Sequence, residues 1–185
     1  MPVFVSLLRG VNLGAHNRIK MDALRDLYES LGLTDVKTYV QSGNVVFRAK
    51  EKDEAKLRSR IEIAIEKKFG FRPDVVLRTT AEMREAVAKN PFAERRGIEP
   101  DKLLVTFLAE EPSAEAKKKL AGIKADPELL YLLGRELYIY FQEGLARPKL
   151  PWMAVVKTLK TTGTGRNWNS VEKLLEMAEE LEASR

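Results

Sequence analysis

The segment RGVNLGAHNRIK, residues 9–20, combines glycine, asparagine and basic residues in a pattern that could hold an anion. Its two glycines allow backbone N–H groups to point into a concavity, and a helix after the segment would offer its positive end. The glycine spacing fits neither G-x-x-x-x-G-K-[ST] nor G-x-G-x-x-G, so neither nucleotide-binding motif is present. Alternatively, the glycines only form tight turns and the basic side chains are solvated. The candidate ligand-binding residues here are Arg9, Gly10, Asn12, Gly14, Arg18 and Lys20.

A second candidate segment, QSGN at residues 41–44, lies between two short runs of strand-forming residues. Ser42, Gly43 and Asn44 could contribute polar groups to the same site. The alternative is turn chemistry alone, because Ser-Gly or Gly-Asn suits a two-residue primed hairpin turn.

The third candidate segment is KTTGTGRNWNS, residues 160–170, which we expect to be a loop between two helices. Threonine hydroxyls with Arg166 and Asn167 at a helix start would suit a phosphate or a carboxylate, and Trp168 completes the candidate set. Equally, Arg166 could hold a carboxylate of the other subdomain. Structural roles are also available. Gly163 could cap the preceding helix, Asn169 could be the N-cap of the next helix, and Trp168 could pack against that helix.

Several kinds of active site are excluded by composition. The chain has no cysteine, which removes disulfides, thiolate catalysis and cysteine-based metal sites, and His16 is its only histidine. No catalytic residue can be assigned, and we expect no metal site and no cofactor. His16 could act as a general base, but an exposed loop histidine is the simpler interpretation because no carboxylate is placed beside it.

Positive charge is concentrated in the first half of the chain. Residues 1–90 contain 17 Lys and Arg against 12 Asp and Glu, whereas residues 91–185 contain 15 of each. A basic half favours phosphate-bearing partners through electrostatic steering and counterion release. A net charge of +5 also simply aids solubility.

The first half of the chain predicts the element order βαββαβ. The strand-like runs are residues 2–8, 36–40, 44–47 and 74–79, and amphipathic helical spacing covers residues 21–31 and 53–69. This is the split βαβ, or ferredoxin-like, order. The first and second strands then run the same way, so the loop of residues 9–20, the QSGN hairpin and the turn containing Arg72 should meet at one end of the sheet.

The second half predicts a related order, after a connecting helix at residues 80–90 and a polar linker. The expected strands are residues 102–109, 129–133 and 136–141, with helices at 113–123, 150–159 and 170–181. We therefore predict an α+β protein of tandem ferredoxin-like (βαββαβ-type) subdomains with C-terminal helices. Residues 1–90 form the N-terminal subdomain with its connecting helix, and residues 91–185 form a C-terminal subdomain of βαββ plus two helices.

No stretch of the chain approaches 18 apolar residues, and the run MPVFVSLL has neither a basic leader nor a small-residue cleavage site. A cytoplasmic location and no membrane partner are therefore expected. The sequence does not indicate an oligomeric state.

Three of these segments also resemble a known bacterial family. LLRGVNLG, VKTYVQSGNVVF and TTGTGRNWNSVEKL, with the helix that begins at Met21, resemble the proteins called domain of unknown function 1697. The resemblance covers nearly the whole chain and implies a two-part α+β fold. It supplies no reaction, cofactor or catalytic residue, so the motif residues named above are carried over as candidates.

Three classes of function remain open from the sequence. The first, which we favour, is binding of a phosphate-bearing small molecule or nucleic acid through the basic glycine-containing loop. The second is an enzyme that acts on a small anionic metabolite in a cleft between the subdomains, with Arg9 and Arg166 as anion clamps. The third is a non-catalytic protein-interaction scaffold.

Overall fold

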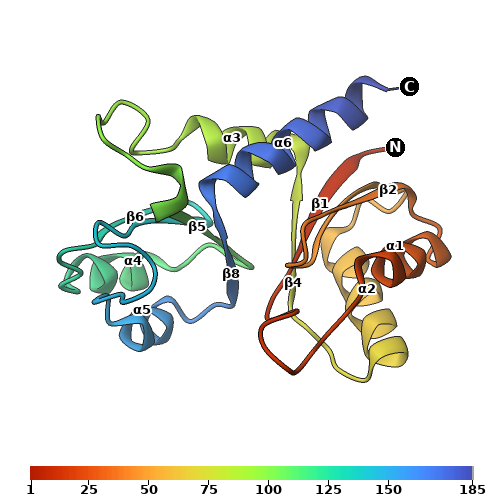
Figure 1. The fold of residues 1–185 in the computed structure, drawn as a ribbon, viewed down its shortest axis with the longest axis horizontal. Helices are drawn as coiled ribbons and strands as arrows, with labels where there is room; N and C mark the ends of the chain where they lie inside the picture. The colour runs from red at the N-terminus through yellow and green to blue at the C-terminus, as the bar shows by residue number, and fades with distance from the viewer. Residues whose placement is uncertain (185) are drawn as a thin grey trace. The chain divides into compact units, whose positions relative to one another are not determined.

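The computed structural model describes residues 1–184, and these divide into two compact units (Figure 1). The first unit contains Met1–Glu85 and Glu172–Arg185, and the second contains Ala86–Val171. The boundaries therefore fall inside two helices, one in the middle of the chain and one at its C-terminal end. The last helix, predicted from the sequence to lie wholly in the C-terminal subdomain, has most of its length in the first unit.

The first unit is built on a four-stranded antiparallel sheet with the strand order β2-β3-β1-β4. This order, with a helix after the first strand and another after the third, is the predicted ferredoxin-like arrangement. Its elements are β1 (Val3–Leu8), α1 (Met21–Ser30), β2 (Thr34–Tyr39), β3 (Asn44–Arg48), α2 (Glu54–Phe69), β4 (Val75–Thr79) and the start of α3 (Thr80–Ala88).

Helices α1 and α2 cover one face of this sheet (Figure 1). Apolar residues recur along each helix at the spacing that forms one face, and they pack with alternate residues of the strands, as Leu24, Ile61 and Phe47 do. Tyr28 of α1 is fully buried in this core, and its hydroxyl lies 2.8 Å from Ser6 Oγ of β1. Burial raises the Tyr28 pKa above its usual range, and the Ser6 hydrogen bond only partly opposes this effect.

The second unit repeats the arrangement with the strand order β6-β7-β5-β8. Helices α4 and α5 contribute to a core with one face of the sheet, in which Leu120 and Val155 pack with Ile139. The elements are a short 3-10 helix η1 (Pro100–Lys102), β5 (Leu103–Leu108), α4 (Ala114–Ala121), β6 (Leu129–Leu133), β7 (Glu136–Tyr140), α5 (Trp152–Leu159), β8 (Gly163–Asn167) and α6 (Trp168–Ala183).

The prediction of a loop between the last two helices is wrong, because residues 163–167 form strand β8. The glycines that indicated a loop instead allow β8 to lie close against β5. A Cβ on Gly163 would lie 2.8 Å from Leu108 Cδ2 and 2.9 Å from Phe107 O. The second unit is therefore a complete βαββαβ, rather than βαββ with two helices.

The helix ends near β8 also differ from the expected ones. Lys160, with φ 54°, is the left-handed C-cap of α5, so Gly163 has no capping role. The Asn167 side chain accepts a hydrogen bond of 2.9 Å from the Ser170 N–H at the start of α6. Asn167 is therefore the residue that caps α6, not Asn169.

No helix among residues 1–184 is long and apolar enough to cross a membrane. The same residues contain no group of three or more metal-binding side chains that could hold an ion.

Candidate functional site

The loop of residues 9–20 lies at one end of the first sheet, as the sequence predicted. Leu8 at the end of β1 is the register partner of Val75 at the start of β4, and Leu7 is the partner of Asn44 at the start of β3. The Leu8 N–H donates to Gly43 O at 3.0 Å, and the Arg9 N–H donates to Asp74 O at 3.0 Å. The loop, the β2–β3 connection and the turn before β4 therefore meet at this end.

Asn12 fixes the path of the loop. Its Nδ2 donates to Ile19 O at 2.9 Å and to Gln41 O at 2.7 Å, and its Oδ1 accepts from the Ile19 N–H at 2.8 Å. These three bonds close the loop on itself and attach it to the β2–β3 connection. Asn12 has φ 57°, a left-handed conformation that asparagine tolerates better than most residues.

Ser42 and Gly43 lie in the turn between β2 and β3, and Asn44 is the first residue of β3. Four residues, 40–43, separate the paired ends of these strands, so the expected two-residue hairpin turn is wrong. Asn44 Nδ2 donates to Tyr39 O at 3.0 Å and to Ser42 Oγ at 2.9 Å, which closes the turn. Gly43 has φ 80°, and a Cβ there would lie 2.8 Å from Leu8 Cβ. The bonds described here support the structural alternative for this segment.

The basic side chains of the loop differ in their surroundings. Arg9 forms a half-exposed ion pair with Asp74 at 3.2 Å. Within residues 1–184, the Arg18 guanidinium makes one hydrogen bond, from Nε to Gly14 O at 3.0 Å. Lys20 makes no side-chain hydrogen bond or ion pair with these residues. His16 is exposed and likewise has no side-chain partner among the described residues. Two exposed cations, Arg18 and Lys20, are thus left available for a ligand.

Arg72, which the sequence placed at the same end of the sheet, forms ion pairs with α2. Its guanidinium lies 3.1 Å from Glu62 Oε2 and 3.9 Å from Glu66 Oε2. The Glu62 carboxylate also accepts a bond from the Val75 N–H at 3.1 Å. Arg72 therefore helps to attach α2 to the start of β4.

Arg166, Asn167 and Trp168 belong to the second unit. Arg166 lies in β8 and is 7% exposed, and its Nη1 donates to Thr164 Oγ1 at 2.7 Å and to Gly165 O at 2.9 Å. Burial lowers the pKa of Arg166 to about 10, so its guanidinium remains charged at neutral pH. Trp168 is the buried first residue of α6. A single site that combines these residues with the loop of residues 9–20 stays a prediction.

The first sheet contains a buried arginine that is not among the candidates from the sequence. Arg78 in β4 is 1% exposed, and its Nη1 donates to Leu77 O at 2.9 Å. A similarity between the segments VVLRT and GTGRN could have indicated it. In both strands the fourth residue is arginine, and the fifth, Thr79 or Asn167, caps the helix that follows. The glycines of the second segment favour a loop, which hides this similarity.

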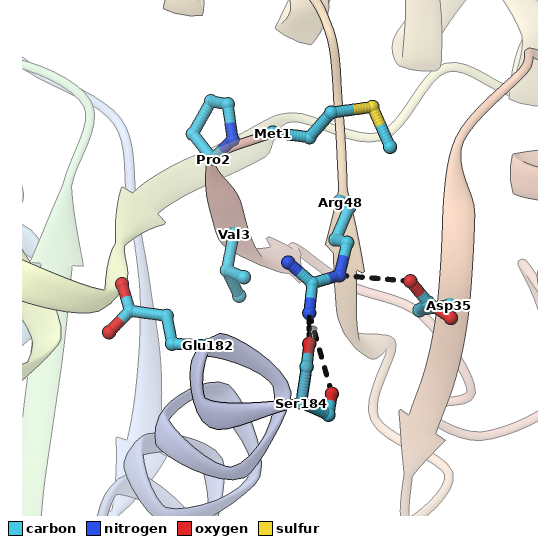
Figure 2. Close-up of a pocket in the computed structure, with 7 residues that line it drawn as sticks. All are labelled: Met1, Pro2, Val3, Asp35, Arg48, Glu182 and Ser184. Carbon is cyan, nitrogen blue, oxygen red and sulfur yellow. Dashed lines mark hydrogen bonds and ion pairs between the residues drawn. The ribbon is translucent and has the colours of Figure 1, made fainter.

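A pocket in the first unit lies at the opposite end of the sheet from the loop of residues 9–20. It has a volume of about 720 Å³, and its lining includes Met1, Val3, Asp35, Arg48 and Ser184 (Figure 2). None of these residues is a candidate from the sequence. Arg48 belongs to no recognisable motif, because it is a single arginine at the end of a strand.

Arg48 is the central side chain of this pocket and is engaged on two sides. Its Nε donates to Asp35 Oδ2 at 2.9 Å, and its Nη2 donates to the Leu181 and Ser184 carbonyl oxygens at the end of α6. A cation at a helix C-terminus is stabilised by the helix dipole and satisfies terminal carbonyl groups. Glu182 turns away from Arg48 in Figure 2 and lies 3.5 Å from Arg84 Nη2. The contacts of Arg48 at this pocket therefore attach the end of α6 to strands β2 and β3 of the first unit.

Comparisons with known proteins agree with this fold. The chain is similar to the conserved bacterial protein SP0830 from Streptococcus pneumoniae, with 20% sequence identity and a TM-score of 0.72, over 96% of this chain and 98% of that one. At this identity the similarity shows the fold alone. No curated protein matches the chain. The family model described as protein of unknown function (DUF1697) matches residues 1–138, so the chain belongs to that family.

Proposed function

We propose that the protein binds a phosphate-bearing ligand, nucleic acid included, through the loop of residues 9–20. The observation that supports this best is the pair of exposed cations, Arg18 and Lys20, on a loop that contains no carboxylate. Arg9 contributes less, because Asp74 already offsets its charge. A phosphate diester or monoester suits these groups, since guanidinium and ammonium groups both bind phosphate oxygens.

The way the loop is anchored adds to this argument. Asn12 holds the two ends of the loop together, so less conformational freedom would be lost when a ligand binds. Residues 13–18 are all exposed, which leaves their backbone and side chains accessible. A cytoplasmic location, where nucleic acid and phosphorylated metabolites are abundant, belongs to the same proposal.

The proposal is tested by measuring the affinity of the full chain for a fluorescent single-stranded oligonucleotide across a series of salt concentrations. If Arg18 and Lys20 bind phosphates, the Arg18→Ala/Lys20→Ala variant should lower the slope of log affinity against log salt by roughly 0.7 for each phosphate that is no longer neutralised. The matched control is Lys52→Ala/Lys56→Ala, which removes the same charge from exposed positions of the same unit. Equal slopes for the two variants, or binding that ignores salt, would reject the proposal.

A further inference from the structure

A second pocket lies in the second unit, beside the segment that precedes β5. It has a volume of about 410 Å³, and its lining includes Arg95, Arg96, Gly97, Ile98, Glu99 and Tyr140. Ligand pockets in proteins are commonly roughly 300–1,000 Å³, so a small molecule fits this volume.

Arg95 is held in place at this pocket by aromatic side chains. Its guanidinium carbon lies 5.2 Å from the Phe92 ring centre and 5.5 Å from the Tyr131 ring centre, within the range of cation–π attraction. Its Nη2 also donates to the Tyr131 hydroxyl at 2.7 Å. The guanidinium is therefore oriented before any ligand arrives.

The backbone after Arg95 offers several donors together. The N–H groups of Arg96 and Gly97 donate no hydrogen bond within residues 1–184. Gly97 has φ 78°, and successive N–H groups around a left-handed residue are the arrangement found in backbone anion sites. The Arg96 side chain also has no hydrogen bond or ion pair among the described residues. Cationic and neutral donors are thus concentrated in one short segment.

Tyr140 attaches this segment to the sheet. Its hydroxyl accepts from the Glu99 N–H at 3.2 Å and donates to Gly97 O at 3.4 Å. The one carboxylate that lines the pocket, Glu99, forms an ion pair with Lys102 Nζ, which offsets its charge. The donors beside it are therefore held in place and face little competing negative charge.

From this arrangement we infer that the pocket binds the phosphate group of a small phosphate ester. Two consecutive N–H groups and two guanidinium groups match the several oxygens of a tetrahedral oxyanion better than those of a planar carboxylate. The volume beyond the phosphate leaves room for a small organic group. This site lies in the second unit and is separate from the loop of residues 9–20.

The test is a titration of the isotope-labelled full chain with inorganic pyrophosphate, followed by the amide signals in nuclear magnetic resonance spectra. The largest changes are expected at the amides of Arg96, Gly97 and Ile98, and sodium chloride at matched ionic strength should not reproduce them. Arg96→Ala should weaken pyrophosphate binding about tenfold, the usual effect of losing one charged hydrogen bond. Arg147→Ala, an exposed arginine of the same unit, should leave the affinity unchanged.

The Arg18→Ala/Lys20→Ala variant separates this site from the proposed function. In this variant, pyrophosphate should still change the amide signals of residues 96–98, and Arg96→Ala should still weaken that binding. Both results are expected even if oligonucleotide binding is lost. The inference would be overturned by changes scattered over the surface, by equal changes with sodium chloride, or by an unaltered affinity in Arg96→Ala.

Discussion

Arg78 and Arg166 occupy the same position in the two sheets. Arg78 is the register partner of Val5 and Arg166 is the register partner of Val105, each valine being the third residue of its sheet's first strand. Each arginine is buried, and each Nη1 donates at 2.9 Å to the carbonyl oxygen of the residue before it. The similarity of the two units thus extends from strand order to a specific side chain and its bond.

Because of this equivalence, Arg78→Ala and Arg166→Ala should destabilise the protein by similar amounts. Each change removes hydrogen bonds from a charged group and leaves a cavity, so we expect a loss of about 2–4 kcal/mol in the free energy of unfolding. Urea denaturation measures it. The exposed control Arg147→Ala should stay within about 0.5 kcal/mol of the unaltered protein. A large loss in one variant and none in the other would show that the two positions are not equivalent.

Asn12→Ala should release the loop of residues 9–20 without unfolding the sheet. The change removes three hydrogen bonds, and we expect a loss of about 1–3 kcal/mol. Hydrogen exchange at the Ile19 amide should become faster, because that N–H loses its acceptor. Asn12→Asp keeps the acceptor and should protect Ile19 better than alanine does. If exchange is the same in all three proteins, Asn12 does not fix the loop.

Two asparagines at the start of α6 form a matched pair for a capping experiment. Asn167→Ala removes the acceptor for the Ser170 N–H and should cost about 1 kcal/mol in thermal or urea unfolding. Asn169→Ala, at an exposed position within the first turn, should change stability by less than about 0.5 kcal/mol. The reverse order of effects would restore Asn169 as the cap.

Substitution of Gly163 tests why β8 contains glycine. In Gly163→Ala the new Cβ would meet Leu108 Cδ2 at 2.8 Å and Phe107 O at 2.9 Å, so we expect a loss of about 1–3 kcal/mol in the free energy of unfolding. Gly122→Ala is the matched control, because Gly122 has φ −84° and its Cβ would meet only Lys119 O at 3.4 Å. Comparable losses in both variants would mean that close strand packing is not the reason.

Stability should fall as the pH rises above about 10, in part because of Tyr28. Its pKa is raised in the folded state, so the folded protein keeps a phenol proton that the unfolded chain, with the ordinary tyrosine pKa of 10.0, has lost. The stabilisation is complete below pH 10 and decreases above it by about 1.4 kcal/mol per pH unit. Tyr28→Phe should remove this part of the slope in urea titrations between about pH 8 and 11. A slope unchanged by the substitution would contradict the assignment.

The sequence by itself determined the order of most elements and the meeting of two candidate segments. Apolar residues at helical or alternating spacing predicted α1, α2 and the four strands of the first sheet, because these periods follow from local geometry. The ferredoxin-like order then placed the loop of residues 9–20 beside the turn at residues 40–43, and the Leu8–Gly43 and Asn12–Gln41 bonds agree with that placement.

Only the tertiary structure decided that GTGRN is a strand. Glycine has low strand propensity, so local preference alone favours a loop, and the deciding factor is the space that β5 leaves beside Gly163 and Gly165. The same holds for Arg48, Arg95 and Arg78, since their roles depend on acceptors, aromatic rings or burial that arise from the packing of separate elements. Spacing in the sequence reports periodicity along one element, whereas these surroundings form only when distant parts of the chain pack together.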